Sequence, residues 1–201
     1  APLHRRWDAA LARDLAGRLA LPMTRATRTL SRGEAMKAAL LLALAARPRV
    51  LVMDEPFNGV DALSRDELAR AVLAAAADDG TTVLVAAHDI MELETMVDHV
   101  AILAGGRLRA AGPVEAVKAR YRKVTVTGER AALDAVAGAG AWLSVERAGR
   151  MLAAVHDGDA PPLDERALRD AGAESVAIEE LPLREVFAAL ARAARGQGVA
   201  A

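Results

Sequence analysis

The spacing of apolar residues changes several times along the chain, and it predicts a mixed α/β protein. Apolar residues four apart over 7–19 indicate an amphipathic helix. Residues 32–46 are apolar nearly all round, which predicts a buried helix. The continuous apolar run 50–53 has the length of a strand, as expected of a parallel strand that is covered on both faces, and TTVLVAA at 81–87 predicts the next buried strand.

A βαβ unit is the arrangement predicted for the two apolar strands. Ser64 opens a capping-box pattern that starts a helix between them, and Gly80 ends this helix. Such crossovers are almost always right-handed in a parallel sheet. A ligand site is then expected beyond the carboxyl ends of the strands, where Asp54 and Glu55 follow the first strand and His88 follows the second.

The pattern changes after Arg120, and it predicts a second, smaller α+β part. Its elements follow the order strand, helix, strand, strand, helix, strand, over 123–127, 129–136, 141–146, 151–156, 163–171 and 175–181. This order predicts a ferredoxin-like appendage, which a final amphipathic helix over 182–195 follows. We therefore expect a first domain over 1–120, the appendage over 121–195 and a disordered tail over 196–201.

Composition narrows the classes of function. The 26 basic and 27 acidic residues nearly balance, so no global field favours binding to nucleic acid. The longest apolar run, 38–46, is far shorter than the roughly 20 residues of a membrane-spanning helix, so we expect a soluble polypeptide whose membrane role comes through a partner. Zero Cys excludes disulfides. The start at Ala1 rather than at Met suggests a piece of a longer protein.

Two groups of residues have positions that suit phosphate chemistry. Phosphoryl transfer to water needs a Mg²⁺ anchor and an oriented water, and Asp54 and Glu55 at a strand end could supply both. Ser31 followed by Glu34 predicts a capped helix start, and such an N-terminus with a hydroxyl and the Gly33 N–H is also a phosphate site. A plain turn and a plain helix cap are the alternatives for these two groups.

Four segments in a fixed order resemble the motifs of the ATP-binding-cassette (ABC) ATPases. LSRGE at 30–34 resembles the signature, VLVMDEP at 50–56 the Walker B strand, NGVD at 58–61 the D-loop, and His88 the switch His. A lone His at a strand end is more often structural, so the assignment of His88 depends on this resemblance. The resemblance covers residues 7–120 and implies the second half of a P-loop NTPase-like ABC cassette, with a parallel sheet and a helical subdomain.

The resemblance also implies a role for each residue. Asp54 would hold Mg²⁺ through water, Glu55 would orient or deprotonate the attacking water, and His88 would hydrogen-bond the γ-phosphate. The signature would contact ATP held by a second subunit. The residues implied in nucleotide binding are Leu30, Ser31, Arg32, Gly33, Glu34 and Asp61, the last of which would also meet the second subunit.

Several departures from the family pattern affect these expectations. Arg32 stands in place of a Gly of the family's LSGGQ, Glu34 in place of its Gln, and Phe57 in place of a common Thr or Ser. The sequence contains no GxxxxGK[ST], the loop that holds the α- and β-phosphates, so this chain by itself is not expected to bind Mg-ATP. Without the first half of a cassette, strand edges and apolar sheet faces should be open.

The implied function is that of an ATP-binding and hydrolysing subunit of an ABC transporter. It would work through nucleotide-driven dimerisation with a second ATPase subunit and would power a separate membrane permease from the cytoplasmic face of the cell membrane. The appendage and the segment before the signature resemble bacterial exporters of the ABC-2 group. The alternatives are a degenerate or truncated, non-catalytic half-cassette and an ABC ATPase that acts outside transport, on ribosomes or DNA ends.

Overall fold

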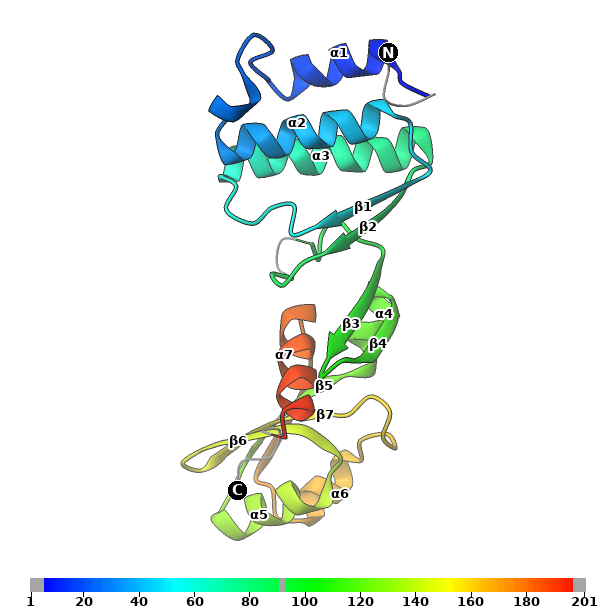
Figure 1. The fold of residues 1–201 in the computed structure, drawn as a ribbon. Coiled ribbons are helices and arrows are strands. Elements are labelled where there is room, and N and C mark those ends of the chain that lie inside the picture. Colours follow the sequence, from blue (N-terminus) through cyan, green and yellow to red (C-terminus); the bar gives the residue numbers. More distant parts are fainter. Residues whose placement is uncertain (1–5, 91–92, 197–201) are drawn as a thin grey trace. The chain divides into compact units, whose positions relative to one another are not determined.

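The computed structural model describes residues 6–90 and 93–196, which fall into two compact units (Figure 1). The first unit ends at Asp89 and the second begins at Ile90. No helix in the described part of the chain combines the length and hydropathy of a membrane span.

Over its described residues, 6–89, the first unit has three α-helices, a short 3₁₀ helix and two parallel strands. Its elements are α1 (Ala9–Arg18), η1 (Thr27–Thr29), α2 (Arg32–Ala45), β1 (Val50–Asp54), α3 (Ala62–Asp79) and β2 (Thr82–Ala86). Strands β1 and β2 pair in parallel, in register from Val50 with Thr82 to Asp54 with Ala86. The predicted βαβ order is therefore confirmed. Helices α2 and α3 lie between α1 and the two strands (Figure 1).

The helix starts follow local capping chemistry, with one correction to the sequence prediction. Ser31 caps α2 in a capping box with Glu34, as predicted. Helix α3 begins earlier than expected, at Ala62, because the carboxylate of Asp61 accepts a hydrogen bond from the Ser64 N–H at 2.9 Å. Ser64 is therefore inside the helix and is not its cap. Gly80 ends α3 at a φ of 64°, as expected of a left-handed C-terminal residue.

One face of the β1–β2 pair is open. Leu51 is buried, whereas Val50, Val52 and Leu84 are 58%, 66% and 60% exposed. Strands with such side chains are normally covered on both faces. The predicted open apolar sheet face is thus confirmed for this unit.

A buried ion pair joins α2 to α3 and gives a testable stability prediction. Lys37 is 8% exposed, and its ammonium contacts the carboxylate of Glu67. Glu67→Ala should lower the free energy of unfolding by about 3 kcal/mol, because it leaves the Lys37 charge buried and unpaired. Urea unfolding of the full-length protein measures this loss.

The matched control for this pair removes both charges. Lys37→Met combined with Glu67→Leu should recover most of the lost stability, since neither variant side chain needs a charged partner. A double variant as unstable as Glu67→Ala alone would show that packing, and not the unpaired charge, causes the loss.

The second unit contains a hairpin, a four-stranded sheet and four helices among its described residues. Its elements are β3 (His99–Ala104), β4 (Arg107–Pro113), α4 (Val114–Arg120), β5 (Arg122–Thr127), α5 (Arg130–Ala139), β6 (Trp142–Ala148), β7 (Met151–His156), α6 (Glu165–Asp170), β8 (Ser175–Glu180) and α7 (Leu183–Ala194). The sheet has the order β6-β7-β5-β8, and its neighbours are antiparallel. The predicted ferredoxin-like arrangement is confirmed.

Two hydrophobic clusters explain why the units divide where they do. One cluster lies within the ferredoxin-like sheet and its helices, and it includes Val124, Leu133 and Leu152. The other joins Ile102 of the hairpin and Tyr121 after α4 to the C-terminal helix; its remaining buried members are Ala110, Val114, Val117, Leu181, Leu183, Val186 and Leu190. The hairpin and α4 thus pack with the chain's last helix, and the compact units divide at Ile90 instead of near residue 120.

The disordered tail expected over 196–201 stays a prediction. Its residues 197–201 lie outside the described part of the chain.

Candidate functional site

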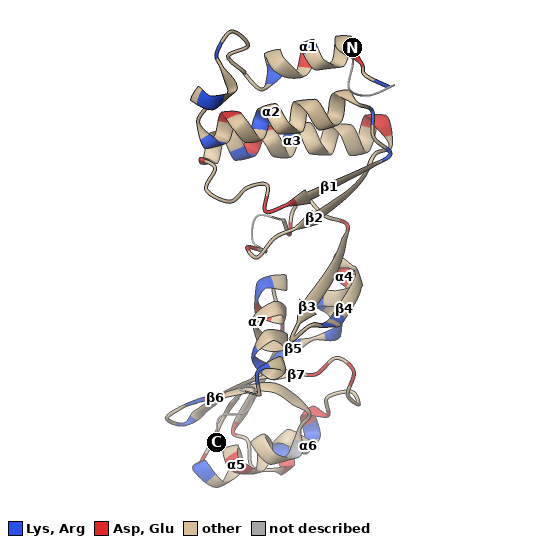
Figure 2. Ribbon diagram, viewed as in Figure 1, with Lys and Arg blue, Asp and Glu red and all other residues tan. Residues whose placement is uncertain are grey.

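The carboxyl ends of β1 and β2 bring three of the predicted site residues together. Asp54 ends β1 opposite Ala86, and the N–H of Glu55 donates to the Ala86 carbonyl at 2.8 Å. Oε1 of Glu55 lies 2.7 Å from Nδ1 of His88. Figure 2 shows acidic residues where β1 ends. Parallel pairing of the two strands therefore juxtaposes groups that are far apart in the sequence.

The backbone of Glu55 is strained where the chain leaves β1. Its φ is 47°, in the left-handed region that few residues other than glycine adopt. Such a conformation costs of order 1–3 kcal/mol and is often found at functional sites. Because the chain leaves the strand geometry here, Glu55 reaches His88.

The Glu55–His88 pair has chemistry suited to handling a proton. With a proton on Nδ1, the imidazole donates to the carboxylate and fixes its orientation. The other carboxylate oxygen is then available to accept a hydrogen bond from a water molecule. The His88 side chain is 72% exposed and that of Glu55 is 35% exposed, so both can be reached from solvent.

The LSRGE turn is held by a network that the sequence only partly predicted. Ser31 N–H donates to Glu34 Oε2 at 2.7 Å, and Glu34 N–H donates to the Ser31 hydroxyl at 3.2 Å. Arg25 donates to Glu34 Oε1 at 2.9 Å and to the Thr29 carbonyl at 2.8 Å. The hydrogen bond from Ser31 lowers the pKa of the Glu34 carboxyl, and the charge of Arg25 also lowers it.

This network compensates the negative charge that Glu34 brings to the signature in place of Gln. The Glu34 carboxylate is turned to Ser31 and paired with Arg25, so its charge is largely compensated. The next two N–H groups of α2, on Arg32 and Gly33, are first-turn donors without intrahelical acceptors. Together with the positive end of the helix dipole they form a potential anion site. Sequence reasoning missed Arg25, for which the Arg- and Thr-rich connector was the only signal.

The NGVD loop lies directly against the LSRGE turn. A Cβ on Gly33 would be 3.1 Å from the Ser64 hydroxyl and 3.5 Å from Asp61 Oδ2. A Cβ on Gly59 would be 2.7 Å from the Arg32 guanidinium. The structure therefore brings the predicted signature and D-loop residues together at the N-termini of α2 and α3.

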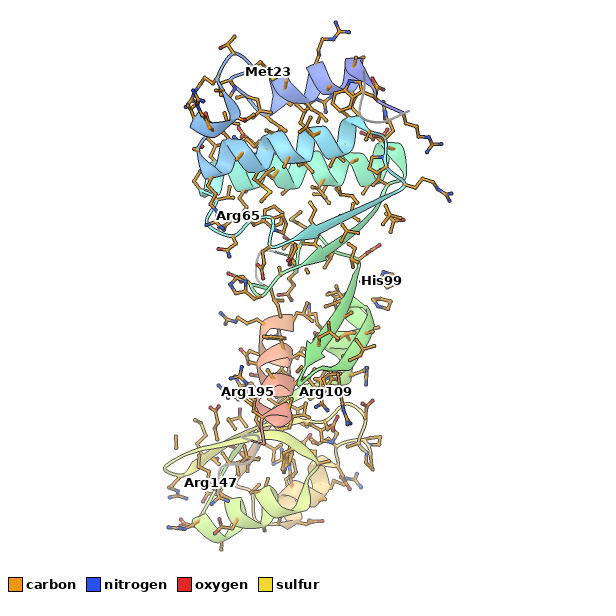
Figure 3. All side chains as sticks on the ribbon, viewed as in Figure 1. Met23, Arg65, His99, Arg109, Arg147 and Arg195 are labelled. Carbon is orange, nitrogen blue, oxygen red and sulfur yellow. The ribbon has the colours of Figure 1, made fainter. Side chains whose placement is uncertain are left out.

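The side chain of Asp61 caps the N-terminus of α3 in this structure. Its hydrogen bond from the Ser64 N–H is the main cause that lowers the pKa of the Asp61 carboxyl. Arg65, labelled in Figure 3, donates to the Val60 carbonyl beside it at 3.4 Å. The expected contact of Asp61 with a second subunit stays a prediction.

A magnesium ion fits the strand end through a single protein ligand. Asp54 offers exposed carboxylate oxygens, which are ligands that Mg²⁺ prefers. Within the described residues, no three His, Cys, Asp or Glu side chains gather as a metal site. Water and phosphate oxygens would therefore complete the coordination, as is usual for Mg²⁺.

Comparison with curated proteins gives consistent relatives, although no protein-family profile matches the chain. The molybdenum import ATP-binding protein ModC of Rhodobacter capsulatus is 38% identical over 97 residues, which are 48% of this chain and 27% of the relative. ModC of Rhodopseudomonas palustris BisB18 is 32% identical over 194 residues, 87% of this chain and 49% of the relative. The ABC transporter ATP-binding protein YtrB of Bacillus subtilis is 28% identical over 122 residues, 61% of this chain and 42% of the relative.

The solved structures with similarity to the chain include cbiO1 of Clostridium perfringens, part of the ABC transporter complex cbiONQ. It is 26% identical, with a TM-score of 0.47, over 55% of this chain and 45% of that one. The chain spans half or less of the length of the curated relatives named above. In sequence, the chain is a relative of the ATP-binding proteins of ABC transporters.

Proposed function

We propose that the chain supplies the water-activating and signature residues of an ABC-type ATPase that powers a membrane transporter. The observation that carries the proposal is the 2.7 Å contact between Glu55 and His88 beside Asp54, at the carboxyl ends of two parallel strands. ATP is the nucleotide in the names of these curated relatives.

Glu55 is the group that acts on the attacking water. Its carboxylate accepts a hydrogen bond from the water and takes the proton as the water oxygen bonds to the γ-phosphorus, while the bond from the γ-phosphorus to the β–γ bridging oxygen breaks and ADP leaves. His88 orients this carboxylate through its Nδ1–H, and with a second proton on Nε2 the ring also donates a hydrogen bond to the phosphate when the nucleotide is present. A Mg²⁺ ion anchored by Asp54 would neutralise phosphate charge.

The LSRGE turn acts on a second nucleotide. Its first-turn N–H groups and the Ser31 hydroxyl form an anion site that contains neither Asp54 nor Glu55. We propose that it closes on the γ-phosphate of ATP bound to a second ATPase subunit, so that ATP drives dimerisation. Dimerisation would drive a conformational change in a separate membrane permease. The ATPase subunit would then bind this permease at the cytoplasmic side of the membrane.

The alternatives have less support. A non-catalytic half-cassette has no chemical need for the Glu55–His88 pair or for the strained φ of Glu55. The curated relatives named above carry transport names, which favours transport over work on ribosomes or DNA. The predicted export direction stays a prediction, and two of those relatives are named as import proteins.

Phosphate release by the full-length protein tests the proposal. His88→Ala should reduce ATP turnover at least tenfold, since Glu55 loses its orienting partner and the phosphate loses a donor. His99→Ala is the matched control, because His99 lies exposed on β3 and contacts Asp98, outside the candidate site (Figure 3). Equal turnover in the two variants would reject the role assigned to His88.

A further inference from the structure

We propose that Arg32 is a positioning residue that connects the LSRGE turn to the 57–61 loop and, through this loop, to Glu55. The inference rests on the proposed ATPase function. It gives a role to the position where this sequence has Arg in place of the family's Gly.

The Arg32 guanidinium occupies the space beside Gly59 that a side chain would fill. An added Cβ on Gly59 would be 2.7 Å from Nη1, 2.9 Å from Cζ and 3.2 Å from Nε of Arg32. Three guanidinium atoms within this range mean that the planar group covers the Gly59 backbone. Gly59 also has a φ of 68°, so its position requires glycine for conformation and for contact.

The loop that Arg32 covers is fixed on both sides of Gly59. Phe57 and Val60 are 4% and 5% exposed, and Val60 N–H donates to the Phe57 carbonyl at 3.2 Å. Because these anchors are buried, a shift of Gly59 has little room to be absorbed within the loop.

The same loop is bonded to the candidate catalytic residue. Asn58 N–H, next to Gly59, donates to the Glu55 carbonyl at 3.2 Å. A path of direct contacts therefore runs from Arg32 to Gly59, then through Asn58 to Glu55. A glycine at position 32 would have no side chain, so it could not make the contact with Gly59.

A second contact keeps the turn and the loop in register without using Arg32. Gly33 packs against Ser64 and Asp61 at the start of α3, which follows the loop. Loss of the Arg32 side chain should therefore loosen the loop without separating the two helices.

Hydrogen exchange of the nucleotide-free, full-length protein tests the contact. In Arg32→Ala, the amides of Asn58 and Val60 should exchange about fivefold faster, which corresponds to about 1 kcal/mol of lost protection. Arg32→Lys should behave like Arg32→Ala, because an ammonium cannot cover the Gly59 backbone as a planar guanidinium does. Arg28→Ala, in the exposed η1 turn, is the matched control and should exchange at the wild-type rate.

Steady-state ATP hydrolysis tests the link to Glu55. Arg32→Ala should lower kcat about fivefold with little change in KM for ATP, since the change alters the position of Glu55 and removes no phosphate contact. A higher KM with unchanged exchange would mean that Arg32 is a phosphate ligand, and would overturn the positioning role. Faster exchange with unchanged kcat would overturn the link to Glu55.

The two measurements separate this inference from the proposed function. Wild-type protein without ATP hydrolysis under any condition would reject the ATPase proposal and with it the link to Glu55. The exchange rates need no nucleotide, so they still decide whether Arg32 holds the loop. Unchanged exchange in Arg32→Ala would reject the contact whatever the activity.

Discussion

Replacing Glu55 with Gln should leave ATP binding to the full-length protein intact and reduce turnover at least a hundredfold. The amide keeps an oxygen that accepts the hydrogen bond from His88 Nδ1, so the local geometry at the strand end is preserved. It cannot take a proton from water at neutral pH. The loss should therefore appear in kcat, with the dissociation constant for ATP unchanged.

Single-turnover hydrolysis and equilibrium binding of ATP measure the two quantities separately. Glu180→Gln removes an exposed carboxylate of β8, outside the first unit, and serves as the control. Full turnover by Glu55→Gln would show that another group activates the water. Loss of ATP binding would show that Glu55 holds the nucleotide or its metal.

Replacing Ser31 with Arg should abolish ATP-dependent dimerisation while the monomer stays folded. The bulky, charged side chain would fill the space in front of the first turn of α2, where we propose that the γ-phosphate of a second subunit binds. Loss of the N-cap hydroxyl should cost only about 1 kcal/mol of stability. Light scattering with and without ATP, in the Glu55→Gln background that prevents hydrolysis, measures the dimer.

Two further substitutions separate the cap from the contact. Ser31→Thr keeps a hydroxyl that can accept from the Glu34 N–H, so dimers should still form. Ser31→Ala loses the cap without adding bulk, so it should match the stability loss of Ser31→Arg and keep weaker dimerisation. If Ser31→Arg dimerises with wild-type affinity, Ser31 only caps α2 and does not contact the phosphate of a second subunit.

Local patterns were sufficient for much of the first unit. Two continuous apolar runs with a capped helix between them predicted β1, α3 and β2, because strand length and helix punctuation are properties of neighbouring residues. Asp54 and Glu55 at the end of β1 and His88 after β2 were then expected at one edge, since parallel strands end on the same side. The order of elements likewise predicted the ferredoxin-like sheet.

The details that local patterns left open depend on competition between neighbouring groups. Both Asp61 and Ser64 can cap a helix, and the structure uses Asp61, whose carboxylate accepts the Ser64 N–H. Arg25 could have faced solvent, yet it pairs with Glu34 across the connector. Such choices depend on which side chains come within reach after folding.

What the sequence by itself determined was the order of strands and helices, the capping box at Ser31 and the placement of Asp54, Glu55 and His88 at strand ends. Only the tertiary structure decided that the chain divides at Ile90 and that Arg32 covers Gly59. The physical reason is the range of the interactions. Strands, caps and turns arise from nearby residues, whereas a hydrophobic cluster or a guanidinium packed on a distant glycine needs the whole unit to be folded.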